Sequence, residues 1–298
     1  MLSKRVLILA ATAVAPITWG STYIVTSQFL PPGTPLLDAA ARALPAGLIL
    51  LAITRKLPHG AWWWKSAVLG LLNIGAFFAL LFVAAYLLPG GVAATVGAVQ
   101  PLILTVLASR FLGERLRSRQ ILAGAAGVAG VGILVLGAQA RLDAMGVLAA
   151  LGGAASMAAG VVLSKKWGRP ESPLALTAWQ LTSGGILLLP ALLLVEGLPA
   201  EPPTLANLAG FAYLAVVGTA LAYALWFRGI ALLPVGSTSF LGLLSPLVAV
   251  LLGWAALGQA LSWSQVLGAA IILGALASVL APQRQRAPAK EPQAAGRT

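Results

Sequence analysis

The sequence contains no cysteine, one histidine and seven acidic residues among its 298 residues. The absence of cysteine excludes disulfide bonds, thiolate nucleophiles and cysteine-ligated metals. The single histidine, His59, lies in a basic loop, and the apolar segments contain no paired carboxylates. Because general acid–base and metal-ion catalysis need such groups, we expect no enzymatic activity, no metal site and no cofactor.

Charged residues are also scarce, at 9% of the chain, whereas 59% of the residues are hydrophobic and the mean hydropathy is +0.94. Soluble domains do not have this composition. A run of about 20 apolar residues spans a bilayer core of roughly 30 Å, and the sequence supplies one such run after another. The composition therefore predicts an all-α membrane protein that crosses the bilayer several times.

The net charge of +12 falls in short clusters between the apolar runs. Basic clusters in such places contact anionic lipid headgroups and set membrane orientation, so we expect lipids as partners and no nucleic acid. The first apolar run, from Val6, is too long for a signal-peptide core, and we interpret it as a spanning helix.

Breaks at proline, glycine and charge divide the chain into ten expected transmembrane helices. They lie near residues 6–29, 35–54, 66–87, 91–112, 119–137, 144–164, 173–195, 207–228, 236–256 and 263–281. The segment 283–298 is polar and rich in proline, alanine and glutamine, which predicts a disordered cytoplasmic tail.

The distribution of lysine and arginine tests this count, because ten spans place every second loop on the same side as both termini. Seventeen of the nineteen basic residues fall on that side, whereas Arg141 falls on the other and Arg42 lies within span two. The positive-inside rule then predicts that both termini are cytoplasmic and that the protein lies in a bacterial inner membrane.

An internal repeat becomes visible when the chain is shifted by 145 residues. The segment LLPGGVAATVGAVQPL, 87–102, then lies over LLPVGSTSFLGLLSPL, 232–247, and the match continues without a gap from 112–122 over 257–267. A weaker match lays the segment from Pro35 over the segment from Pro173. We therefore expect two five-helix repeats, 1–138 and 139–282, which enter the membrane from opposite sides because five is odd, an inverted-topology repeat.

The chain at this point resembles the EamA branch of the drug/metabolite transporter superfamily. The resemblance depends on the ten spans, the WGSTY segment at 19–23, Arg42 in span two, a proline in spans four and nine, and the LGERL segment at 112–116. It implies a substrate cavity among spans one, three, four, six, eight and nine, with spans five and ten as a peripheral scaffold. Within the branch, the chain is similar to bacterial exporters of amino acids, especially aromatic ones. It differs in having Gln259 where the first repeat has Glu114.

Polar and aromatic side chains within the spans are the candidate substrate-binding residues, because a polar group in hydrocarbon is costly unless it has a partner or faces water. The candidates are Trp19, Thr22, Tyr23, Asn73, Phe78, Gln100, Ser156, Tyr223, Trp226 and Ser245. Their hydroxyls can instead bond to the preceding helical turn or join neighbouring helices, and their rings can serve core packing. Phe78 and Tyr223 are equivalent under the 145-residue shift.

Asp38 and Arg42 stand four residues apart on span two, so both side chains can lie on one helix face near the outer side. We expect a structural ion pair there, or alternatively an outer gate or a carboxylate-binding arginine. No acid lies in span one, which disfavours proton exchange through such a group.

The pair Gln100–Pro101 and its repeat equivalent Ser245–Pro246 interrupt spans four and nine. Proline removes a hydrogen-bond donor and frees a carbonyl about one turn earlier. We expect Pro101 and Pro246 to act as hinges at which these two spans bend near the membrane centre.

These features favour a secondary transporter that exports small neutral or zwitterionic metabolites, aromatic or hydrophobic amino acids first, by alternating access. The sequence contains no intramembrane basic cluster for phosphorylated cargo, and transport that simply follows the substrate gradient is compatible with it. A lipid-handling or structural membrane protein, or an exporter of another metabolite or drug class, remains the alternative. We expect a monomer with a small-molecule substrate.

Overall fold

Proline and small polar residues between the apolar runs begin several of the helices. Ser172 caps α10 (Pro173–Ala191) by accepting a hydrogen bond from the Ala175 amide at 3.2 Å. Asp143 caps α9 (Ala144–Lys166) by accepting one from the Gly146 amide at 2.8 Å. Thr204 forms a capping box with Asn207 at the start of α11 (Leu205–Ala215). These contacts satisfy amide groups that a helix leaves unpaired in its first turn, which is why the chain enters helices at these residues.

The computed structural model describes residues 4–88, 96–135, 143–199, 201–258 and 262–280. These residues form helices, and no strand occurs among them. The helices of the first half are α1 (Lys4–Gly20), α2 (Thr22–Phe29), α3 (Pro35–Thr54), α4 (Trp62–Gly70), η1 (Leu71–Gly75), α5 (Ala76–Leu87), α7 (Gln100–Leu112) and α8 (Ser118–Val135). Those of the second half are α9 (Ala144–Lys166), α10 (Pro173–Ala191), η2 (Leu192–Glu196), α11 (Leu205–Ala215), η3 (Val216–Leu221), α12 (Ala222–Leu232), α13 (Val235–Thr238), η4 (Ser239–Leu243), α14 (Leu244–Leu257) and α15 (Trp263–Leu280).

Eight helical stretches are long and apolar enough to cross a membrane, and two shorter apolar helices, Gln100–Leu112 and Ser118–Leu134, accompany them. The prediction of an all-helical membrane protein is therefore confirmed for the described residues. Of the ten expected spans, span four is described only from residue 96, because residues 89–95 lie outside the described part.

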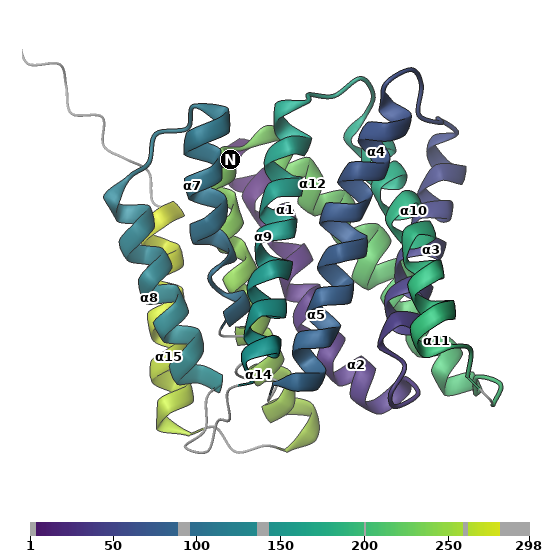
Figure 1. Ribbon diagram of the computed structural model, residues 1–298. Coiled ribbons are helices and arrows are strands. Elements are labelled where there is room, and N and C mark those ends of the chain that lie inside the picture. Colours follow the sequence, from purple (N-terminus) through teal and green to yellow (C-terminus); the bar gives the residue numbers. More distant parts are fainter. Residues whose placement is uncertain (1–3, 89–95, 136–142, 200, 259–261, 281–298) are drawn as a thin grey trace, which may run out of the picture.

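The helices pack side by side in one bundle (Figure 1). α8 and α15 pair at one edge of it, and α3 pairs with α10 toward the opposite edge. Between these pairs, α9 packs on α5 and α7, while α1 packs on α12 and α14. The N-terminal end of α1 and the C-terminal end of α15 lie at the same end of the bundle, at the top of Figure 1. We call this the terminal end; the loops that carry the basic clusters also lie there.

Helix ends recur at positions 145 residues apart. α5 and α12 end at equivalent residues, and α8 and α15 begin and end at equivalent residues. α7 and α14 are both terminated by a glycine in the left-handed conformation, Gly113 with φ 68° and Gly258 with φ 65°, which a side chain would strain. The two halves therefore end these helices with the same backbone conformation.

The helix interruptions at the two prolines differ from the expected bends. α7 begins at Gln100 and carries Pro101 in its first turn, after a turn at residues 98–99. The other interruption consists of the 3₁₀-helical segment η4 directly before α14, which carries Pro246. Since proline lacks the amide hydrogen but fits a first turn, a new helix starts at this place in span four instead of continuing with a bend.

Candidate functional site

Four of the predicted substrate-binding rings lie together inside the bundle. The ring centroid of Trp19 is 5.1 Å from that of Tyr223 and 5.3 Å from that of Trp226. Phe78 meets Tyr223 edge to face at 6.2 Å. Phe78, Tyr223 and Trp226 are buried, whereas Trp19 is half-buried. We call these four residues the ring cluster; α1, α5 and α12 supply them.

Arg42 joins span two to the ring cluster and to span eight. Its guanidinium carbon lies 4.8 Å from the centre of the Phe78 ring, which is a cation–π distance. Its Nε donates to the Thr219 hydroxyl at 3.1 Å, and its Nη2 donates to the Gly218 carbonyl at 3.3 Å. The buried charge of Arg42 is therefore spread over an aromatic face and two acceptors of a different helix.

Thr219 and Gly218 belong to η3, one of two π-helical turns at equivalent positions in spans three and eight; the other is η1. A π-turn widens the helix by one residue and leaves main-chain groups that helix neighbours can bind. Trp19 donates from Nε1 to the Gly218 carbonyl at 3.1 Å, and Ser156 donates from its hydroxyl to the Leu72 carbonyl in η1 at 2.9 Å. Each π-turn is thus held by a side chain from the opposite half of the chain.

Asn73 lies in η1 and is the centre of a buried amide network. Its Nδ2 donates to the Gln180 side-chain oxygen at 2.6 Å and to the Ser164 hydroxyl at 3.3 Å. Gln180 in turn donates from Nε2 to the Leu176 carbonyl at 3.3 Å. Asn73 is fully buried and its Oδ1 has no hydrogen-bond partner among the described residues. We call Asn73, Gln180 and Ser164 the amide network.

Arg42 and Gln180 occupy equivalent places in the weaker repeat match, in which Pro35 lies over Pro173. Each lies seven residues into its helix, and α3 and α10 start at opposite ends of the bundle. Each side chain also crosses to a π-turn of the other half, Arg42 to η3 and Gln180 to η1. The charged contact of Arg42 therefore lies nearer one end of the bundle, and the neutral contact of Gln180 lies nearer the other end.

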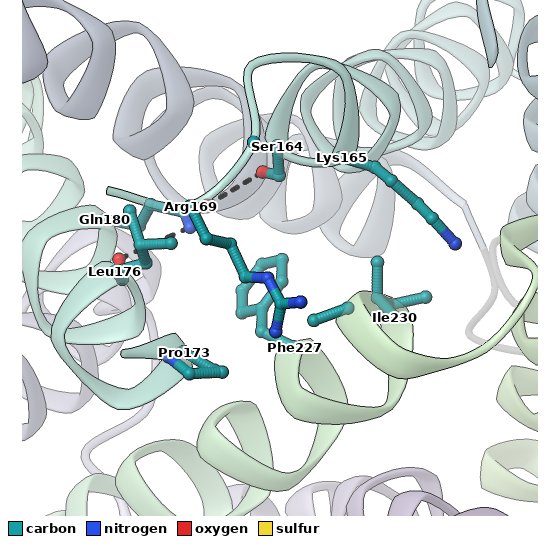
Figure 2. A pocket seen from close by; sticks show the side chains of 10 residues that line it. Ser164, Lys165, Arg169, Pro173, Leu176, Gln180, Phe227 and Ile230 are labelled. Carbon is teal, nitrogen blue, oxygen red and sulfur yellow. Dashed lines mark hydrogen bonds between the residues drawn. The ribbon is translucent and has the colours of Figure 1, made fainter. Parts of the chain in front are cut away.

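A pocket of about 420 Å³ opens beside the amide network at the terminal end (Figure 2). α9, α10, α12 and the loop before α10 form its walls, and its lining includes Lys165, Arg169, Leu176, Gln180, Phe227 and Ile230. The Phe227 ring lies 5.9 Å from Tyr223 of the ring cluster. Phe227 in the pocket wall therefore contacts the buried aromatic residues.

Other predicted substrate-binding residues lie outside this arrangement. Gln100 lines a crevice of about 30 Å³ beside Phe77, away from the larger pocket. The hydroxyl of Thr22 is buried without a hydrogen-bond partner among the described residues. Ser245 is half-buried on α14, close to α1. The side chain of Tyr23 and the residue Gln259 lie outside the described part.

Asp38 and Arg42 are both buried, at 5% and 4% exposure. Among the described residues, the side chains close enough for ion pairs are Lys56 with Glu171 and Lys165 with Glu114. The expected Asp38–Arg42 ion pair is therefore not formed in this structure. Asp38 accepts a long hydrogen bond from the Thr34 hydroxyl at 3.4 Å, while the guanidinium of Arg42 reaches span eight. Helical spacing permitted the pair, but the acceptors on η3 lie nearer to the guanidinium.

Several site residues were missed by the sequence reasoning. Gln180 and Thr219 are not among the predicted residues, although the overlay of Arg42 on Gln180 is a signal that points to Gln180. Lys165 and Arg169 were counted only as orientation charges, because nothing in the sequence shows that their loop borders a pocket.

Glu114, in the LGERL segment, caps a helix of the other half. Its two carboxylate oxygens accept hydrogen bonds from the amides of Val235 and Gly236 at 2.8 and 2.9 Å, at the start of α13. Lys165 lies 3.8 Å from the same carboxylate. The residue therefore ties the end of α7 to the start of span nine at the terminal end.

Replacing Glu114 with alanine is expected to destabilise the protein by about 1–2 kcal/mol, because two helix amides lose their acceptor. The measurement is the thermal unfolding midpoint of purified protein in detergent, which should fall by a few degrees. Glu114→Gln keeps one acceptor oxygen and should fall less. The control is Glu201→Ala at an exposed position; an equal change in both alanine variants would contradict the capping role.

Comparisons with known proteins agree on one family. The model of the EamA-like transporter family matches residues 6–136 and again 144–281. The chain is 48% identical over 264 residues to protein PecM of Dickeya dadantii, covering 88% of each chain. It is 32% identical over 271 residues to the uncharacterized inner membrane transporter YedA of Escherichia coli K12, covering 88% of this chain and 87% of that protein. A chain of known crystal structure has the same fold, with a TM-score of 0.79, 21% identity, and coverage of 92% of this chain and 97% of the other.

Proposed function

The chain belongs to the EamA-like transporter family, and we propose that it exports small neutral or zwitterionic metabolites, aromatic or hydrophobic amino acids first, as a secondary transporter. The observation that carries this proposal is the pocket at the terminal end, whose lining residue Phe227 packs against Tyr223 of the ring cluster. Its volume of about 420 Å³ suits a small molecule. The aromatic rings behind Phe227, which meet at a tilt or edge to face, would favour a flat or apolar side chain.

We propose further that the fold is a ten-helix inverted-topology repeat of residues 1–138 and 139–282. The recurrence of helix ends and of π-turns at a 145-residue spacing supports it. The helix packing is also reciprocal: α1 on α12 and α14 corresponds to α9 on α5 and α7 once the halves are exchanged. The family model, which matches the chain in two consecutive stretches, gives independent support.

The mechanism we propose is alternating access, in which the halves rock about the ring cluster. Arg42 and the amide network would then be two counterparts that close the route near opposite ends of the bundle. The described pocket lies at the terminal end, where the loops carry the basic clusters, so the positive-inside rule assigns it to the cytoplasm. The structure would accordingly represent a state open to the cytoplasm, in a bacterial inner membrane, with the protein acting as a monomer.

A counterflow screen of the twenty amino acids in proteoliposomes that contain only this protein tests the proposed function. We expect exchange of aromatic or hydrophobic amino acids. Tyr223→Ala should reduce the exchange by about tenfold or more, because the ring joins the pocket wall to Trp19 and Phe78. Trp254→Ala, at a ring that is 52% exposed, is the matched control and should behave as wild type.

Wild-type exchange in Tyr223→Ala would contradict the site. Absence of counterflow for every amino acid would contradict the substrate class. Movement of labelled lipid without any counterflow would favour the lipid-handling alternative instead, since an apolar lining does not exclude acyl chains.

A further inference from the structure

Arg169 is a cation in the pocket wall that has no compensating partner in the described part of the chain. It lies in the loop between α9 and α10, is exposed, and has no hydrogen bond or ion pair with any described residue. Figure 2 shows its guanidinium extending from that loop into the space between α10 and α12. The charge is therefore available to a molecule that enters the pocket.

The acid nearest to Arg169 in the sequence and the acid nearest to the pocket residue Lys165 already have other partners. Glu171, two residues after Arg169, forms an ion pair with Lys56, and the hydrogen bond from Lys56 lowers the pKa of Glu171. Glu114 pairs with Lys165 and caps α13. Both carboxylates are thus occupied by lysine side chains, which leaves Arg169 as the cation that an anionic ligand can neutralise.

The backbone holds Arg169 in place more firmly than its exposure suggests. Gly168, with φ 78°, adopts a conformation that favours glycine and turns the chain directly before it. Pro170 follows, and a residue before proline is restricted to extended conformations. Ser172 then starts α10 by accepting a hydrogen bond from the Ala175 amide. The guanidinium therefore projects from a loop whose two neighbours limit its freedom.

The wall of the pocket below Arg169 is apolar, with Leu176, Phe227 and Ile230 in the lining. A cation at the mouth and an apolar wall beneath it complement a small molecule that has a carboxylate at one end and an apolar group at the other. Guanidinium binds carboxylate through two parallel hydrogen bonds, a geometry that amides and hydroxyls do not reproduce.

We propose that Arg169 selects substrates by their carboxylate, which it binds at the mouth of the pocket while the apolar part lies against Phe227. The proposal rests on the proposed function and deepens it, because it names the group by which an amino acid is distinguished from its neutral derivatives. The same guanidinium chemistry would also bind the phosphate of an anionic lipid headgroup, so the test must separate these two sources.

The experiment measures counterflow of labelled phenylalanine in vesicles of phosphatidylcholine alone and in vesicles with added phosphatidylglycerol. Unlabelled phenylpropionate, which has the carboxylate without the amine, and phenylalaninamide, which has the amine without the carboxylate, serve as competitors. In the wild type, phenylpropionate should compete at least about tenfold better than phenylalaninamide, because only the former offers a carboxylate to the guanidinium.

Arg169→Gln should raise the KM for phenylalanine by about tenfold with little change in maximal rate, and should remove the preference for phenylpropionate over the amide. Arg169→Lys should retain part of that preference, because lysine keeps the positive charge but cannot form the two parallel hydrogen bonds of a guanidinium. The matched control is Arg228→Gln, an exposed arginine adjacent to Phe227 that does not line the pocket; it should behave as wild type.

A thermal-shift measurement in detergent with the same two competitors separates failure of this inference from failure of the proposed function. If no amino acid is exchanged but phenylpropionate stabilises the wild type and not Arg169→Gln, the proposed substrate is wrong and the carboxylate site stands. Equal competition by both compounds, or no stabilisation by phenylpropionate, overturns the inference. An effect of Arg169→Gln that appears only with phosphatidylglycerol also overturns it, in favour of a lipid headgroup.

Discussion

Arg42→Leu is expected to lower substrate counterflow by about 100-fold, because the state with a closed outer route loses the charged donor to two buried acceptors of η3 and the balance between the two states shifts away from it. Hydrogen bonds to charged groups contribute about 1.5–3 kcal/mol each, and a loss of about 3 kcal/mol corresponds to two orders of magnitude. The Phe78 ring would also lose the cation that lies 4.8 Å from its centre. The measurement is initial counterflow rate per unit of reconstituted protein.

The matched variant is Gln180→Leu, at the equivalent position of the other half. Its contacts to Asn73 and Leu176 are between neutral groups, which contribute about 0.5–1.5 kcal/mol each, so about a tenfold loss is expected. Equal losses in both variants would contradict a role for the charge of Arg42. Thermal unfolding of the same preparations shows whether a lost rate reflects a lost fold.

The charged contact of Arg42 with η3 is stronger than the neutral contacts of the amide network, and this difference affects the transport cycle. If opening the outer route requires Arg42 to leave η3, while opening the inner route disturbs only the amide network, the outward-open state is the costlier one. A resting state open at the terminal end follows, in agreement with the pocket there. Such a bias would suit the proposed export, because the positive-inside rule assigns that end to the cytoplasm.

The ring cluster could be anticipated from the sequence, because large aromatic residues deep in apolar spans have few places to lie except against each other. Trp19, Phe78, Tyr223 and Trp226 were predicted as site residues, and the structure brings them together. The all-helical membrane class followed from composition alone, because no soluble domain has so few charges.

The contacts of Arg42 and the two π-turns could not be anticipated in the same way. A four-residue spacing shows that Asp38 can face Arg42, but it does not show which neighbouring helix offers better acceptors. A π-turn has no residue signature, since it depends on how one extra residue is accommodated in a packed helix. The place of Arg169 in the pocket wall could not be predicted for a third reason, because the sequence around a basic loop residue is the same whether the residue faces water or a pocket.

Gly185→Leu is expected to prevent folding, because α3 and α10 cross with almost no space between their backbones. A Cβ atom at Gly185 would lie 2.8 Å from the Cα of Leu44, and one at Gly47 would meet the backbone of Thr182. The contact is reciprocal, since the overlay of Pro35 on Pro173 places Gly47 over Gly185 and Leu44 over Thr182. A backbone neighbour cannot rotate away, so the two helices would have to separate.

This crossing also positions the two polar contacts that the proposed mechanism uses. Arg42 and Gln180 each lie five residues before the glycine of their own helix, which is about 7–8 Å along the axis. A separation of the helices would therefore withdraw both side chains from η3 and η1 together. Gly185→Ala adds only the Cβ, so a fraction of this variant should still fold. Its counterflow rate should fall by a larger factor than its yield of folded protein.

The measurement is size-exclusion chromatography of a fluorescent fusion, followed by thermal unfolding of any monodisperse fraction. Gly274→Ala is the control, because no atom lies within 4 Å of the added Cβ at that exposed position of α15. It should be neutral or stabilising by up to about 1 kcal/mol, since alanine favours a helix over glycine. A wild-type elution profile for Gly185→Leu would show that α3 and α10 can separate without loss of the fold, and the shared dependence of both polar contacts on this crossing would then be wrong.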